Sequence, residues 1–223
     1  IKSNQVILIQ VVKEERGNKG AAVTTRLSLA GKYCVLMPNT NKGGGISRKI
    51  IDIKLRKKLK DLVSKLNIKS GMGVIVRTAG QAMGLKEIKR DYNSLIKLWN
   101  EITSKTIKSN APSLIHEEDN LIKRFLRDYF DSSYENILIN DKKTLQKSKE
   151  IVKQFMPQSV KNLKLYKEKK PLFFSYGVEK KIIDINNPIV HLKSGGYLVI
   201  NQTEALVAID INSGKFTKQR NIE

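Results

Sequence analysis

Arg77 and Thr78 stand at the point where an apolar stretch, residues 73–76, gives way to Ala79 and Gly80. An arginine guanidinium presents a rigid fork of N–H donors, and a neighbouring hydroxyl adds one more. Such a pair suits a phosphate with free oxygens better than a bridging phosphodiester. Glycine lets backbone N–H groups approach the same anion. The residues are compatible with a terminal-phosphate site at a strand end, but from spacing alone the favoured interpretation is an arginine that binds a carboxylate or backbone carbonyls there.

Asp210 lies in an otherwise apolar run, residues 205–211. In a strand it shares a face with Leu206 and Ala208, where the alternation calls for another apolar residue. A carboxylate at the end of a strand is a common ligand of Mg²⁺, and Asn212 is available for a metal-bound water. Because one carboxylate seldom holds Mg²⁺ alone, an ordinary surface aspartate at a strand end is the favoured interpretation of Asp210 in isolation.

Two further stretches combine cations with glycines. Residues 13–20 contain Lys13 and Lys19, which as point charges are suited to an RNA backbone, although a solvated charged loop is the favoured interpretation from composition. Residues 43–49 contain three glycines, a serine and Arg48, a combination that can also hold phosphate. They lack the spacing of a P-loop, so nucleotide hydrolysis is not supported, and a plain turn followed by a helix start is the favoured interpretation.

The elements that position these residues follow from the apolar spacing. Strands are predicted at residues 5–12, 33–37 and 73–76, and glycine and proline predict a loop over residues 38–45. Spacings of three and four predict two helices, from Leu55 to Leu66 and from Leu85 to Ile102.

Beyond Pro112 the pattern changes. Asp119 or Asn120 can cap a helix, and strands at residues 136–139 and 163–166 flank a helix at 144–155. This alternation predicts a small α/β unit with parallel pairing. A helix over residues 178–185 follows, and then strands at 189–192, 197–200 and 204–211 with hairpin turns.

The amino-acid composition narrows the classes of molecule that the chain could bind. The 223 residues carry 42 Lys and Arg against 21 Asp and Glu, a formal net charge of +21, which points first to nucleic acid. No apolar run approaches the ~20 residues of a membrane helix. The single cysteine, Cys34, excludes an internal disulfide and a Cys-rich zinc site, and it suggests a reducing compartment.

Six segments, taken in order, resemble the catalytic half of bacterial ribonuclease E/G endoribonucleases. They cover residues 13–22, 29–39, 44–48, 71–80, 111–116 and 194–213, and so run along nearly the whole chain. The resemblance implies a mixed α/β (α+β) fold of several subdomains. Residues 1–25 would be the end of an S1 (OB-type) RNA-binding domain, 26–121 a 5′-sensor, 122–186 an RNase H-like subdomain, and 187–223 the first strands of a DNase I-like catalytic subdomain.

The resemblance also implies roles for the candidate residues. The 5′-monophosphate of a substrate would be bound by Arg77 and Thr78, with the backbone at Gly31 and Val35 closing the pocket. The RNA path would be lined by Lys13 and Lys19, with Arg48 assisting. One of two Mg²⁺-binding aspartates would be Asp210, and Asn212 would orient metal-bound water.

The implied activity is Mg²⁺-dependent cleavage of single-stranded RNA in RNA processing, rRNA processing and mRNA decay in the bacterial cytoplasm. Full-length family members homo-oligomerise, and an RNA-degradation complex is a further expected partner. DNA is not an expected partner, and nothing in the chain supports membrane association. The family's second metal-binding aspartate and its zinc-binding C-P-x-C link lie in segments that this sequence does not contain. We therefore expect the 223 residues alone to be inactive, the alternative being a non-catalytic RNA-binding module from a split or truncated gene.

Overall fold

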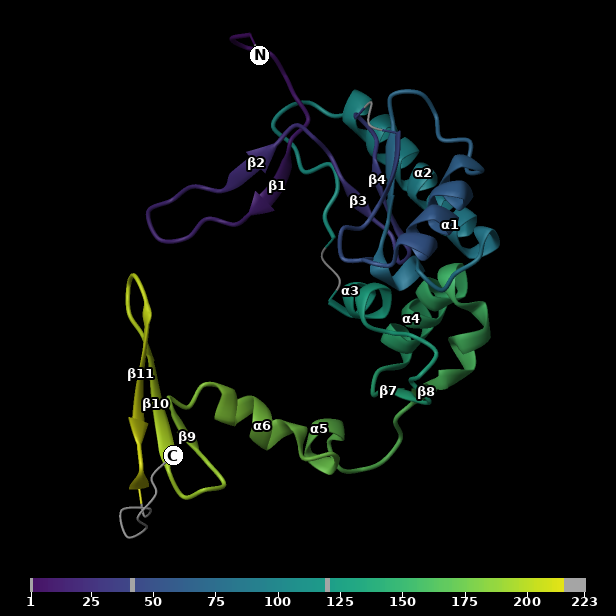
Figure 1. Cartoon of the computed structure of the whole chain (residues 1–223). Helices are drawn as coiled ribbons and strands as arrows, with labels where there is room; N and C mark the ends of the chain where they lie inside the picture. The colour runs from purple at the N-terminus through teal and green to yellow at the C-terminus, as the bar shows by residue number, and fades with distance from the viewer. Residues whose placement is uncertain (1, 41–42, 119–120, 215–223) are drawn as a thin grey trace. The chain divides into compact units, whose positions relative to one another are not determined.

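The computed structural model describes residues 2–40, 43–118 and 121–214, and the helix cap predicted at Asp119 or Asn120 lies outside them. The fold is a mixture of helices and several small sheets, as predicted (Figure 1). The chain divides into two compact units, Ile1–Leu165 and Tyr166–Glu223. The subdomain limits at residues 25, 121 and 186 stay predictions.

The first unit begins with a two-stranded antiparallel sheet of β1 (Gln10–Lys13) and β2 (Ala22–Thr24). The strand predicted over residues 5–12 is wrong for residues 5–9, which have no regular structure. A strand needs a partner for its N–H and C=O groups, and β2 pairs only with residues 10–13. The Val and Ile content of the segment therefore correctly predicted a strand but overestimated how many residues the strand contains.

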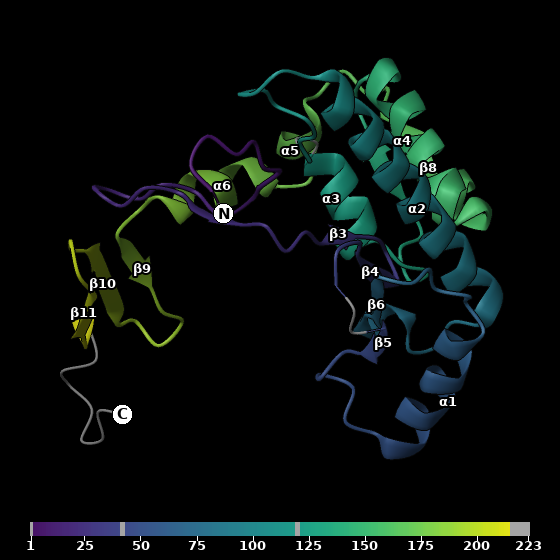
Figure 2. The same ribbon diagram turned by 90° about the horizontal axis from the view of Figure 1, so that it is seen from above.

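A four-stranded sheet forms the centre of the first unit, in the order β3-β4-β6-β5. The helices α1 and α2 pack against it, α1 on β5 and β6, and α2 on β3 and β4 (Figure 2). The sheet and its helices comprise β3 (Leu29–Ala30), β4 (Cys34–Met37), β5 (Gly43–Ile46), α1 (Ile53–Ser64), β6 (Gly73–Val76) and α2 (Leu85–Lys108). The prediction of both helices and of β4 and β6 is confirmed.

The loop predicted over residues 38–45 is confirmed for residues 38–40 but wrong for residues 43–45, because Gly43–Ile46 is strand β5, parallel to β6. The connection β5–α1–β6 is thus a βαβ unit. A Cβ at Gly44 would overlap the side chain of Val63 on α1, so glycine allows the helix to lie close to the strand. Glycine here serves packing and not a turn.

The apolar faces of α1 and α2 meet the sheet in one core. Its fully buried members include Leu36 and Val74 from the sheet, Leu59 from α1, and Ile88 from α2. Asp52 caps α1, because its carboxylate accepts a hydrogen bond from the Leu55 N–H at 3.0 Å. This core fixes the strand ends from which Arg77 and its neighbours project.

A second core lies in the same unit, between α3 (Leu121–Asp128), α4 (Lys142–Phe155), β7 (Ile137–Ile139) and β8 (Leu163–Leu165). Its buried centre consists of Leu126, Phe130, Val152 and Leu163. The predicted parallel pairing is confirmed, since β7 and β8 pair in parallel. A short 3₁₀ helix, η2 (Pro157–Asn162), joins α4 to β8.

The second unit contains α5 (Leu172–Ser175), α6 (Val178–Ile185) and a three-stranded antiparallel sheet in the order β11-β10-β9. These strands are β9 (Ile189–His191), β10 (Tyr197–Gln202) and β11 (Val207–Asn212), so the predicted all-β character from Ile189 is confirmed. Neither unit has, in its described part, a helix of the length and hydropathy that a membrane crossing requires.

Candidate functional site

The loop at residues 31–34 is organised around a buried carboxylate, that of Asp91 on α2. Asp91 accepts hydrogen bonds from the backbone N–H groups of Lys32 at 3.1 Å, Tyr33 at 2.8 Å and Cys34 at 2.9 Å. A Cβ at Gly31 would overlap this carboxylate, so only glycine fits there. Burial, and then the charge of Asp91, raises the pKa of Tyr33 to about 12, and the same two causes raise the pKa of the Cys34 thiol.

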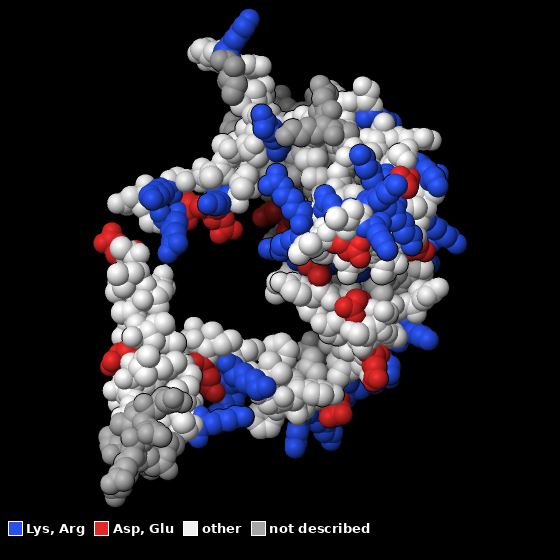
Figure 3. Space-filling view, viewed as in Figure 1, with Lys and Arg blue, Asp and Glu red and all other residues white. Residues whose placement is uncertain are grey.

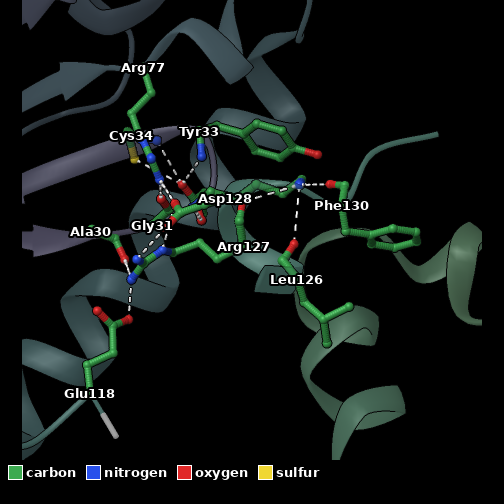
Figure 4. Close-up of polar contacts among 12 residues, drawn as sticks. Ala30, Gly31, Tyr33, Cys34, Arg77, Glu118, Leu126, Arg127, Asp128 and Phe130 are labelled. Carbon is green, nitrogen blue, oxygen red and sulfur yellow. Dashed lines mark hydrogen bonds and ion pairs between the residues drawn. The ribbon is translucent and has the colours of Figure 1, made fainter. Parts of the chain in front are cut away.

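Arg77 follows β6 and precedes a short 3₁₀ helix, η1 (Thr78–Gly80). Its backbone N–H donates to the Tyr33 carbonyl at 2.8 Å, and its Nη1 donates to the Gly31 carbonyl at 2.6 Å. The same Nη1 lies 2.7 Å from Oδ1 of Asp128, the last residue of α3 (Figure 4). The contacts named as the alternative, to a carboxylate and to carbonyls, are therefore present. They occupy one nitrogen of the guanidinium, and the side chain stays 29% exposed.

The structure brings the other predicted sensor residues to the same strand ends. Thr78 begins η1 and is exposed. Val35 lies in β4 opposite Ile75 of β6, and Gly31 precedes that strand. A Cβ at Gly80 would come within 2.8 Å of the Tyr33 carbonyl oxygen, so a glycine allows η1 to fold back against β4.

Asp210 and Asn212 lie near the end of β11, in the second unit. Because side chains two residues apart point to the same face of a strand, they are neighbours, and Nδ2 of Asn212 donates to Oδ2 of Asp210 at 3.0 Å. Asp210 is exposed and opposes Val199 of β10.

The three cations predicted to contact RNA are exposed. Lys13 ends β1, and Lys19 closes a tight turn in which Arg16 and Lys19 exchange backbone hydrogen bonds of 3.0 and 3.1 Å. Arg48 follows β5. None of the three forms an ion pair within the described part of the chain. Lys and Arg side chains also gather over the region of α1 and α2 (Figure 3).

A comparison with models of protein families shows to which family the chain belongs. A model of the Ribonuclease E/G family matches residues 28–223. The chain belongs to the ribonuclease E/G family.

Individual relatives agree with this family. The chain is 45% identical to ribonuclease E of Haemophilus influenzae over 219 residues, which are 98% of the chain and 23% of that protein. It is 42% identical to ribonuclease E of Escherichia coli, over all of the chain and 21% of that protein. Ribonuclease G of H. influenzae is 39% identical, over all of the chain and 45% of its own length. The chain thus spans between about a fifth and a half of these relatives.

Sequence reasoning missed the charged residues that hold the loop at residues 31–34 in place. These are Lys32, Asp91, Arg127 and Asp128. Two of them carried a usable signal: Lys32 interrupts an apolar run, and Asp91 lies beside the apolar stripe of its helix. A charge at such a position is buried and therefore needs partners.

The family resemblance implies Mg²⁺ at Asp210. The carboxylate of Asp210 supplies oxygen ligands of the kind that Mg²⁺ prefers, and the amide of Asn212 lies beside it, where it would orient a metal-bound water. In the described residues no three His, Cys, Asp or Glu side chains come together as a metal cluster. The two residues fit Mg²⁺ as part of a ligand set.

Proposed function

We propose that the chain is part of a Mg²⁺-dependent endoribonuclease that hydrolyses single-stranded RNA, and that its first unit senses a 5′-monophosphate on that RNA. The relatives are named ribonucleases E and G, and the charge of +21 suits a polyanionic substrate. The observation that carries the sensing is the fixed guanidinium of Arg77 at an exposed strand end.

A terminal phosphate differs from a 5′-hydroxyl in its charge and its free oxygens. Nη1 of Arg77 is occupied by Gly31 and Asp128, and no group in the described residues accepts from Nε or Nη2. These two nitrogens match two oxygens of one phosphate. The hydroxyl of Thr78, on the next residue, is available for a third contact.

The proposed catalytic contribution lies in β11. Bound Mg²⁺ activates water and stabilises the charge that develops on a phosphodiester. Asp210 would hold the ion, and the hydrogen bond that Asn212 donates to its Oδ2 fixes the orientation of the carboxylate. Lys13, Lys19 and Arg48 would contact the RNA backbone as exposed cations.

The proposal includes the setting of the whole protein: the bacterial cytoplasm, homo-oligomers, and participation in an RNA-degradation complex. It also includes dependence of cleavage on a second aspartate outside this sequence. The 223 residues alone are then expected to bind RNA without cleaving it.

The sensing is tested by binding. Fluorescence anisotropy compares the affinity of the chain for one oligoribonucleotide with a 5′-monophosphate or a 5′-hydroxyl end, in EDTA. We expect Arg77→Ala to abolish the preference for the monophosphate, while Arg124→Ala, which removes an exposed arginine of α3, leaves it intact. An unchanged preference in Arg77→Ala would exclude the sensing role.

Catalysis is tested by cleavage. In a full-length protein that contains this chain, Asp210→Asn should lower Mg²⁺-dependent cleavage by at least about a hundredfold. Asp184→Asn, which removes an exposed carboxylate of α6, serves as the control. Turnover by the 223 residues alone that Asp210→Asn abolishes would contradict the expected inactivity of this chain.

A further inference from the structure

Asp128 connects the sensing arginine to α3. Its Oδ1 lies 2.7 Å from Nη1 of Arg77, and its carboxylate also accepts from Nε and Nη2 of Arg127 at 3.0 and 2.7 Å. One carboxylate therefore bridges two guanidinium groups, as Figure 4 shows. Hydrogen bonds from Arg127, and secondarily from Arg77, lower the pKa of Asp128 to about 2, so the bridge is ionised at neutral pH.

The contacts of Arg77 are confined to one nitrogen. A guanidinium has five N–H groups, of which Nη1 carries two. One of these donates to the Gly31 carbonyl at 2.6 Å, and the same nitrogen forms an ion pair with Oδ1 of Asp128. We call this pair of contacts the Nη1 clamp.

The Nη1 clamp leaves a second edge of the guanidinium open. The N–H of Nε and one N–H of Nη2 point in the same direction and form a planar fork, which matches two phosphate oxygens. Neither atom has an acceptor among the described residues, and the side chain of Arg77 is 29% exposed. A phosphate can be bound at this edge while both contacts of the Nη1 clamp persist.

The position of Asp128 is itself fixed by contacts with the loop at residues 31–34 and its neighbour Ala30. Nζ of Lys32 donates to the carbonyl oxygens of Leu126, Arg127 and Phe130, at and just beyond the end of α3, where carbonyls lack helical partners. Lys32 is only 5% exposed, and burial lowers its pKa. Nη1 of Arg127 also reaches the Ala30 carbonyl at 3.4 Å. The end of α3 and the loop around Gly31 are therefore held together by three separate side chains, those of Lys32, Arg77 and Arg127.

We propose that Asp128 is a positioning residue for 5′-end recognition: the Nη1 clamp holds the guanidinium of Arg77 so that its Nε and Nη2 face the phosphate. This inference rests on the proposed sensing function. The negative charge of Asp128 is shared between Arg77 and Arg127, and Arg127 also pairs with Glu118. Without Asp128, the Arg77 side chain gains rotational freedom, and a bound phosphate must then order it.

The experiment measures the ratio of the affinities for 5′-monophosphate and 5′-hydroxyl RNA in EDTA. We expect Asp128→Ala to lower this ratio about tenfold by weakening only the monophosphate RNA. Asp128→Asn should lower it less, because the amide oxygen still accepts from Nη1. Asp61→Asn removes an exposed carboxylate of α1 and is the matched control, with no expected change. The ratio is taken on one protein sample, so a partly unfolded variant affects both RNAs equally and leaves it unchanged.

A double-mutant cycle separates positioning from a general electrostatic effect. In the Arg77→Ala background, Asp128→Ala should have no further effect on the ratio. An unchanged ratio in Asp128→Ala would overturn the inference, and a raised ratio would also overturn it by making Asp128 a competitor of the phosphate. If the unmutated chain shows no preference, or if Arg77→Ala retains it, the proposed sensing function itself fails. If Arg77→Ala abolishes the preference and Asp128→Ala retains it, only the role of Asp128 fails.

Discussion

Asp91 provides the sharpest test of how the loop at residues 31–34 is held. Its buried carboxylate, on α2, accepts from three successive backbone N–H groups at 3.1, 2.8 and 2.9 Å. The perturbation is Asp91→Ala, which removes the acceptor and leaves the three donors inside the protein. The helix itself should tolerate the change, since alanine is the best helix former.

The expected cost follows from these contacts. A hydrogen bond to a charged group contributes about 1.5–3 kcal/mol, and a buried donor without a partner costs about 1–3 kcal/mol. The three donors belong to adjacent residues, so one local rearrangement or entering water relieves part of the cost for all of them, and the sum is smaller than three independent terms. We expect the free energy of unfolding to fall by about 3–5 kcal/mol, a large part of the 5–15 kcal/mol typical of a domain.

The assay is urea unfolding followed by tryptophan fluorescence. Trp99 is the single tryptophan of the chain and packs against the core that contains Tyr33 and Cys34. It therefore reports on the part of the fold that the substitution affects. Asp61→Ala, at an exposed position of α1, should change the unfolding free energy by less than about 0.5 kcal/mol.

Asp91→Asn refines the test. The amide keeps one acceptor oxygen but directs an NH₂ group at backbone donors, so it should destabilise by an intermediate amount of about 2 kcal/mol. A loss of less than about 1 kcal/mol in Asp91→Ala, with an unchanged dependence on urea, would refute the reasoning. It would mean that the loop does not depend on this carboxylate.

Three further predictions follow from individual groups. Because burial raises the pKa of Cys34, iodoacetamide at pH 8 should alkylate it at least about tenfold faster in urea than in the folded chain, and equal rates would contradict its burial. The folded pKa of Asp128 is about 2, below the ordinary 3.8, so its contribution to stability is present above about pH 4 and lost as the pH falls towards 2. The difference in unfolding free energy between the unmutated chain and Asp128→Asn should therefore shrink over that interval, and a constant difference would contradict the ionised bridge. Replacing three exposed lysines of α1 (Lys54, Lys57 and Lys60) by alanine should weaken the binding of RNA with either 5′ end equally and reduce the salt dependence of binding. Weaker binding of RNA with only one kind of 5′ end would instead assign these lysines to 5′-end recognition.

Most regular elements could be predicted because their apolar residues repeat with a clear period. α2 and α6 carry stripes with spacings of three and four, and β6 is a short buried run between turn residues. Prediction from sequence patterns fails where a residue type has a role in the structure other than its usual one. The glycines of β5 are typical of a turn, but the structure uses Gly44 to admit the side chain of Val63.

The sequence predicts the residue that donates hydrogen bonds in the candidate site, but not the residues that hold it in place. Arg77 is recognisable because a strand ends before it and glycine follows soon after it. Its partner Asp128 lies in a different part of the chain, at the end of a helix whose other residues give no sign of it. Pairing between distant charges depends on how α3 packs, and a local pattern contains no information on that packing.

The distant partners explain why this arginine can be held so firmly. A guanidinium at the end of a strand has several rotatable bonds, and neighbours in sequence fix only its backbone. The loop before β4 supplies the Gly31 carbonyl, and α3 supplies the Asp128 carboxylate. Lys32 then ties α3 back to the same loop, through an ammonium and a carbonyl that are 98 residues apart. The predicted boundary at residue 121 would separate Arg77 from Asp128. The part of the chain that positions the guanidinium therefore extends beyond residues 26–121, the range predicted for the 5′-sensor. The loop contacts Arg77, Arg77 contacts the end of α3, and the end of α3 contacts the loop again through Lys32. Each contact is weak alone, but together they hold the guanidinium donors in one orientation.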